Sequence, residues 1–122
     1  MPVFSDVQSV LNGIITTWTT GNGDPPDLKG VHGPSFGWSS KAELLAATAK
    51  GQPLIQPAII GVAGKGKTAN IIIDLTTGLT VGGHVYPPMP LGGLDSNNPV
   101  YLDPNSPQIT TIAAWIEAGC PD

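Results

Sequence analysis

The chain has 122 residues, a net charge of −4 and a pI near 4.8, and only 11% of its residues are charged. With five Lys and Arg residues in all, it lacks the basic clusters that bind nucleic acid. Its 16 glycines and 13 prolines predict long irregular connections within a single domain spanning residues 1–122. No apolar run approaches the roughly 20 residues of a membrane-spanning helix, so we expect no membrane insertion.

The first predicted element is a helix from about Asp6 to Thr19. Its apolar residues recur on one helical stripe, which comprises Val7, Val10, Leu11, Ile14, Ile15 and Trp18. Ser5 and Gln8 have the spacing of a capping box, in which the hydroxyl caps an amide and the longer side chain reaches back. Gly21 is expected to end the helix.

Residues 21–37 are predicted to form a loop, because three prolines there exclude regular pairing. Trp38 follows Phe36 after a single glycine. We interpret Trp38 as a lid over a small core, with contact to a partner or a carbohydrate as the alternative. A second capping box, Ser40 to Glu43, predicts a helix that runs to about Lys50.

Residues 68–77 are ambiguous between strand and helix. Three consecutive isoleucines favour a strand, whereas Thr68 as a cap and Gly78 as a stop favour a short helix. We expect the helix, because no partner strand is evident. Residues 78–105, with five prolines among them, are predicted to be irregular.

The last predicted helix has clear start and stop signals. Ser106 is expected at the N-cap with Pro107 at the first helical position, and Gly119 is expected to end the helix. Its inward face comprises Ile109, Ile112, Ala113 and Ile116.

The two ends of the chain resemble class I c-type cytochromes, especially the planctomycete-type domains. Phe4-Ser5-Asp6-Val7-Gln8, followed by Leu11-Asn12, is similar to the opening helix of that family. Met89-Pro90-Leu91-Gly92-Gly93 resembles the segment that supplies the axial methionine of the haem iron. The run from Ile112 to Gly119, with Trp115-Ile116 and then Pro121, resembles the final helix.

This resemblance implies an all-α, cytochrome c-like fold, in which the N- and C-terminal helices pack together among short helices and long Gly/Pro-rich loops. The two best amphipathic helices of a small helical domain usually pack on each other. We expect that contact to involve Val10, Leu11, Ile14, Ile112, Trp115 and Ile116. In the family, the fold carries electrons on haem iron.

The residues that would attach haem are absent. Covalent attachment needs two thiols and an adjacent imidazole in the pattern C-x-x-C-H. When Asn12 is aligned with the family's asparagine, these vestigial attachment positions hold Ile15, Trp18 and Thr19. None of the three forms a thioether or an iron–nitrogen bond. We expect Ile15 and Trp18 to fill space that a porphyrin would occupy, because a void costs about 24 cal/mol per Å³.

A metal site is an alternative. Met89, at the vestigial axial position, would hold copper or non-covalent haem together with His84 or His32, and Cys120 would add a thiol. The simpler interpretation is that Met89 packs in a Pro-rich turn and that the histidines are plain polar loop residues.

Cys120 follows a helix C-terminus, where the dipole disfavours a thiolate, so we expect an unreactive, partly buried thiol.

Residues 61–68 match the phosphate-loop pattern G-x-x-x-x-G-K-[ST]. In such a loop Lys67 would reach the β and γ phosphates and Thr68 would hold magnesium. The pattern requires a buried strand before the loop, and only Ala58 to Ile60 is available for it. The alternative interpretation is a solvated Gly-Lys loop.

We therefore expect a haem-free cytochrome c-like domain, without a cofactor, that acts as a structural or interaction module for a protein partner. It is not expected to be an enzyme, because no serine elbow is present and the carboxylates are scattered. Low charge with many Thr, Asn, Gly and Pro residues suits a periplasmic or extracellular protein. Electron transfer through Met89 and nucleotide binding through residues 61–68 remain the alternatives.

Overall fold

A computed structural model describes residues 2–23, 33–34, 36–49, 51–86 and 102–122 of the chain. The protein is mostly helical, as the sequence predicts, with α-helices α1 (Phe4–Asn22), α3 (Lys41–Ala46), α4 (Asn70–Thr76) and α5 (Pro107–Glu117). Two short 3₁₀ turns, η1 (Pro57–Ile59) and η2 (Gly66–Thr68), lie between α3 and α4. Two small antiparallel hairpins make the all-α expectation wrong in detail: β1 (Thr48–Ala49) pairs with β2 (Gln52–Pro53), and β3 (Leu79–Val81) with β4 (His84–Tyr86).

Helix α1 is longer at both ends than the expected range from Asp6 to Thr19. Val3, not Ser5, is the N-cap, and the Asp6 carboxylate accepts a hydrogen bond from the Val3 amide at 2.8 Å. The C-cap is Gly23 rather than Gly21, with a left-handed φ of 89° that suits glycine. Gln8 does not reach back along its own helix, because it bonds to the loop before α3 instead.

The Ser40 cap of the second capping box is confirmed, the return bond from Glu43 is shifted to Ser39, and the helix that follows is short. The Ser40 hydroxyl accepts the Glu43 amide at 3.1 Å, and the Glu43 carboxylate accepts the Ser39 amide at 2.9 Å. Helix α3 ends at Ala46, before the expected Lys50, because the chain turns into the β1–β2 hairpin. That turn uses Gly51 at a φ of 76°.

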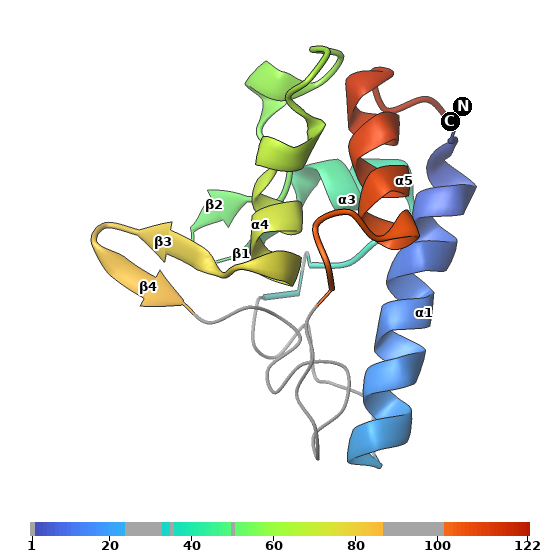
Figure 1. The fold of residues 1–122 in the computed structure, drawn as a ribbon, viewed down its shortest axis with the longest axis vertical. Coiled ribbons are helices and arrows are strands. Elements are labelled where there is room, and N and C mark those ends of the chain that lie inside the picture. Colours follow the sequence, from blue (N-terminus) through green and yellow to red (C-terminus); the bar gives the residue numbers. More distant parts are fainter. Residues whose placement is uncertain (1, 24–32, 35, 50, 87–101) are drawn as a thin grey trace.

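The ambiguous segment 68–77 contains a helix, α4, and not a strand. Its N-cap is Ala69 rather than Thr68, and the amide of Gly78 bonds to the Ile73 carbonyl at 2.8 Å as the helix ends. The following hairpin turns at Gly82 and Gly83, both with positive φ, which is the geometry of tight hairpin turns. This hairpin projects from the side of the molecule (Figure 1).

Helix α5 follows the sequence signals closely. Ser106 caps the Ile109 amide at 3.4 Å, Pro107 opens the helix, and Gly119 adopts a left-handed φ of 93° just beyond it. Its inward face is buried as expected, and Trp115 joins it with no exposed surface.

Helices α1 and α5 pack together, as expected for the two terminal helices. Helix α5 lies along the N-terminal half of α1, and the C-terminal half of α1 extends beyond it (Figure 1). Val7, Leu11 and Ile14 are buried on the α1 side, whereas Val10 is only partly buried. The core continues through α3 and α4 with Leu44, Ile71, Ile72 and Leu75.

The two ends of the described chain meet beside these helices (Figure 1). The Phe4 amide donates to the Pro121 carbonyl at 3.0 Å, and the Phe4 ring lies 6.1 Å from the Trp115 ring. The Lys41 ammonium donates to the Cys120 carbonyl at 3.2 Å and pairs with the carboxylate of Asp122. The segment after α5 is therefore tied to both α1 and α3.

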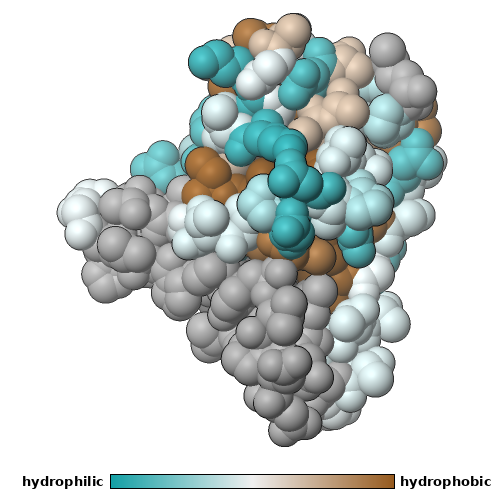
Figure 2. All heavy atoms as spheres, viewed as in Figure 1, coloured by the Kyte–Doolittle hydropathy of each residue, from teal (hydrophilic) through white to brown (hydrophobic). Residues whose placement is uncertain are grey.

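The surface of the described part is largely polar. Figure 2 shows hydrophobic residues on this face as separate patches between hydrophilic ones. Among the described residues, the only large hydrophobic side chain that counts as exposed is Val62, at 41%. None of the described helices combines the length and the apolar character that crossing a membrane requires.

Candidate functional site

The three vestigial attachment positions lie on the C-terminal half of α1. Ile15, Trp18 and Thr19 are all half-buried, so Trp18 is not the fully buried core residue that the helical stripe suggests. The Thr19 hydroxyl donates to the Ile15 carbonyl at 2.8 Å, which binds it to its own helix. These side chains supply no metal-binding nitrogen or sulfur at this place.

The proposed metal ligands are only partly placed. His32 and Met89 lie outside the described residues, and His84 is described only through its backbone in β4. No group of three His, Cys, Asp or Glu side chains that could hold a metal ion is found within the described ranges.

Cys120 is buried at 3% exposure and has an unusual backbone, with a φ of 56°. Burial raises the pKa of its thiol above the ordinary value, and the neighbouring charge of Lys41 opposes that shift. The thiol is therefore protonated near neutral pH, in line with the expected unreactive cysteine.

Backbone amides of the loop at residues 61–68 bind a carboxylate of the protein itself, that of Glu117. The Gly64 amide donates to Glu117 Oε1 at 2.9 Å, and the Gly66 amide donates to Oε2 at 3.1 Å. Glu117 is the last residue of α5, where the helix dipole disfavours a negative charge. The two loop amides offset this by bonding directly to the carboxylate.

The surroundings of this loop differ from those of a phosphate-binding loop. Residues 57–59 form a 3₁₀ turn instead of the required strand. The Lys67 ammonium donates to the Asn105 side chain at 3.0 Å, and the Thr68 hydroxyl donates to the Lys65 carbonyl at 2.6 Å. Both groups assigned to phosphate and magnesium thus have partners within the protein, which argues against the nucleotide alternative.

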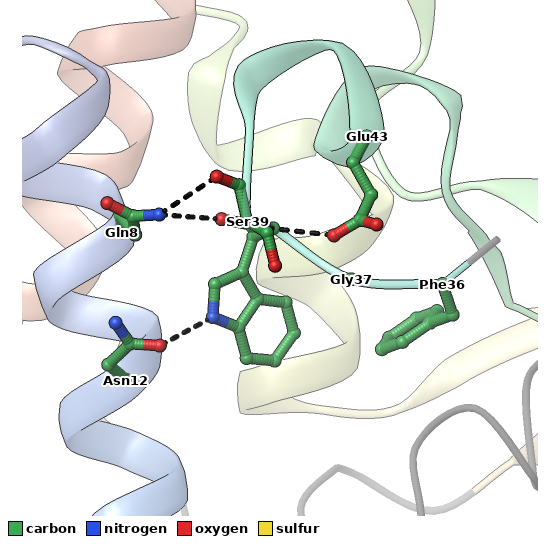
Figure 3. Close-up of a pocket in the computed structure, with 7 residues that line it drawn as sticks. Gln8, Asn12, Phe36, Gly37, Ser39 and Glu43 are labelled. Atoms are coloured by element: carbon green, nitrogen blue, oxygen red, sulfur yellow. Dashed lines mark hydrogen bonds between the residues drawn. The ribbon is translucent and has the colours of Figure 1, made fainter. Parts of the chain in front are cut away.

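A pocket of about 300 Å³ lies where the segment before α3 crosses α1. Its lining consists of Gln8, Asn12, Phe36, Gly37, Trp38, Ser39 and Glu43. Figure 3 shows Gln8 and Asn12 on one side of the pocket and Phe36 and Glu43 on the other.

Hydrogen bonds from α1 fix the position of Trp38. The indole Nε1 donates to Asn12 Oδ1 at 2.8 Å, and the Gln8 side chain donates to the Trp38 carbonyl at 3.0 Å (Figure 3). The Phe36 ring meets the indole nearly edge to face, with ring centroids 6.0 Å apart and an interplanar angle of 73°. This edge-to-face arrangement is one that aromatic pairs prefer.

Sequence reasoning found Trp38 but not the pocket. Trp38 packs partly against the core, as the lid interpretation expects, yet it remains only half-buried. Gln8 and Asn12 lie one helical turn apart on α1, a spacing that places them on one face. Their spacing therefore indicates that the two side chains act on one face of the helix. Their partner, Trp38, lies 26 positions beyond Asn12, and no local sequence pattern predicts a pairing over that distance.

Comparisons with protein-family models, curated proteins and solved structures found no match. The fold itself defines a mostly helical domain with two small hairpins and packed terminal helices.

Proposed function

We propose that this chain is a haem-free cytochrome c-like domain that acts as a structural or interaction module outside the cytoplasm. The proposal rests on two observations about α1, namely its packing against α5 and the residues at its attachment positions. Its N-terminal half packs against α5, while its attachment positions hold Ile15, Trp18 and Thr19.

The packing of the terminal helices supports the cytochrome c-like part of the proposal. The contact buries Val7, Leu11 and Ile14 against the apolar face of α5. Hydrogen bonds to the Pro121 carbonyl then hold the end of the chain against the start of α1. A domain that has lost its cofactor needs such contacts to remain folded, because the porphyrin no longer contributes to the core.

The residues at the attachment positions support the haem-free part. A thioether needs a cysteine sulfur, and the single cysteine, Cys120, lies beyond α5 and is buried. Without thioethers or an axial histidine on α1, covalent haem has no attachment point there. The electron-transfer function of the resembled family is therefore replaced by binding or structural support.

The test is an absorbance spectrum of the protein isolated from its native host, with elemental analysis of the same sample. We expect a colourless protein that contains neither iron nor copper in stoichiometric amount. A Soret band or stoichiometric copper would overturn the proposal and favour the electron-transfer alternative through Met89.

A variant of the same chain provides the control. The triple substitution Ile15→Cys, Trp18→Cys and Thr19→His restores the attachment pattern at the three positions. If this variant acquires covalent haem in the same host, a colourless natural chain reflects its own residues and not a failure of the host to supply haem.

A further inference from the structure

We infer that the pocket around Trp38 is a binding site for a neutral, hydroxyl-rich ligand, that is, a saccharide unit. The inference deepens the proposed function by giving the module a ligand class, and it rests on that proposal in assuming that the domain works by binding. Haem content is tested by the spectrum and the pocket by ligand binding, so either proposal can fail alone.

The pocket has the size of a ligand site, and hydrogen bonds tie its walls to two helices. Its volume of about 300 Å³ lies at the lower end of the range for small-molecule sites, which suits a ligand of one or two rings. Trp38 is held by Asn12 and Gln8 from α1, and the Ser39 amide is held by Glu43 from α3. Two helices thus fix the walls before any ligand arrives, which lowers the entropy cost of binding.

The lining offers both hydrogen-bond donors and acceptors next to an aromatic ring. The bond from the indole uses Asn12 Oδ1, and the bonds to the loop carbonyls use Gln8 Nε2. Within the described part of the chain, this leaves the Asn12 amide NH₂ as a donor and Gln8 Oε1 as an acceptor without partners. Ser39 adds an exposed hydroxyl, which both donates and accepts.

This combination selects against other ligand classes. Among the described lining residues, Glu43 is the one carboxylate and no side chain is basic, so the lining offers no cationic partner for an anion. A purely apolar ligand would strip water from the amide groups of Asn12 and Gln8 without replacing their hydrogen bonds. A sugar hydroxyl donates and accepts at once, and the apolar face of a sugar ring can lie on the half-buried indole.

The first experiment measures binding of a panel of soluble sugars by saturation-transfer-difference NMR, with calorimetry on any that bind. The panel is glucose, xylose, galactose and N-acetylglucosamine with their short β-linked oligomers, and tetramethylammonium is included as a cationic probe. We expect saturable binding of at least one sugar and its loss by at least tenfold in Trp38→Ala. Gln108→Ala, on the exposed side of α5, is the matched control and should bind like the natural chain.

Two further variants keep the inference testable if Trp38→Ala fails to fold. Asn12→Ala removes both the indole's hydrogen-bond acceptor and the free amide, and we expect several-fold weaker sugar binding with the fold retained. Glu43→Gln removes the charge but keeps an oxygen for the Ser39 amide, and a neutral sugar should still bind it. No saturable binding of any sugar, unchanged binding in Asn12→Ala, or preference for tetramethylammonium would overturn the inference.

Discussion

The indole nitrogen of Trp115 donates a hydrogen bond to the carbonyl oxygen of Pro121 at 2.8 Å. The same oxygen accepts the backbone amide of Phe4 at 3.0 Å, so one carbonyl joins α5, α1 and the end of the chain. Trp115 is completely buried, which means that its N–H has no access to water if this bond is lost. The relationship makes Trp115 both the largest apolar side chain of the core and a polar anchor.

Trp115→Phe should therefore be strongly destabilising. It removes the buried hydrogen bond to Pro121 and leaves part of the indole volume empty, so we expect the free energy of unfolding to fall by about 2 to 3 kcal/mol. Chemical denaturation measures this change. Trp38→Phe is the matched control, because its indole bond to Asn12 is exposed and its loss should cost about 1 kcal/mol or less. Equal losses in the two variants would contradict this account.

The carboxylate of Glu117 should contribute to stability through the loop amides it holds. Glu117→Ala leaves the Gly64 and Gly66 amides without their acceptor, and we expect a loss of about 1 to 2 kcal/mol. Glu117→Gln keeps one acceptor oxygen and should lose less. The control is Gln108→Ala on the exposed side of the same helix, and thermal unfolding would rank the three variants. A loss in Gln108→Ala as large as in Glu117→Ala would refute the role of the loop.

Two glycines should respond to alanine in opposite directions. A Cβ on Gly66 would collide with the Ala113 carbonyl and approach Glu117 Oε2 to 2.7 Å, because η2 packs tightly on α5. We expect Gly66→Ala to destabilise the protein by about 1 to 3 kcal/mol. Gly13, inside α1, has nothing within 4 Å of its Cβ position, so Gly13→Ala should stabilise it by about 0.5 to 1 kcal/mol. Denaturant titration distinguishes these signs, and a destabilised Gly13→Ala would be the contrary result.

The buried thiol of Cys120 should make stability depend on pH in the alkaline range. Burial raises the pKa of Cys120 in the folded state above that in the unfolded chain, so the unfolded chain releases its proton first. The contribution is fully present below the unfolded pKa and is lost as the pH rises through the folded pKa. Unfolding measured from pH 7 to 10 should show a decline that is smaller in Cys120→Ala. Identical profiles for the two proteins would rule out this origin.

The sequence predicts elements whose signals are local. Ser106, Pro107 and Gly119 mark α5 correctly, because a cap, a first-turn proline and a left-handed glycine act within one or two turns of the helix. The cap by Ser40 is correct for the same reason. Segment 68–77 is ambiguous from sequence because its isoleucines favour a strand while its flanking residues favour a helix. In the structure it forms helix α4, which buries Ile71 and Ile72 in the core.

Pairings over long sequence distances could not be predicted. Gln8 has the right spacing to cap its own helix, but it bonds to carbonyls 30 and 31 residues away. The loop at 61–68 carries a phosphate-binding pattern, yet its amides bond to a carboxylate more than 50 residues later. In both cases the sequence matches a local pattern, but a tertiary contact determines which groups actually bond.

The loop at 61–68 amounts to a receptor whose ligand is covalently tethered to it. A tethered group is present at its site at an effective concentration on the order of mM or higher, whatever the concentration of the protein. A free anion in dilute solution must compete with Glu117 at that concentration, so Glu117 keeps the Gly64 and Gly66 amides occupied in the natural chain. Removing the carboxylate while keeping Gly64 and Gly66 would turn the same backbone into a vacant receptor, which added formate or acetate should refill.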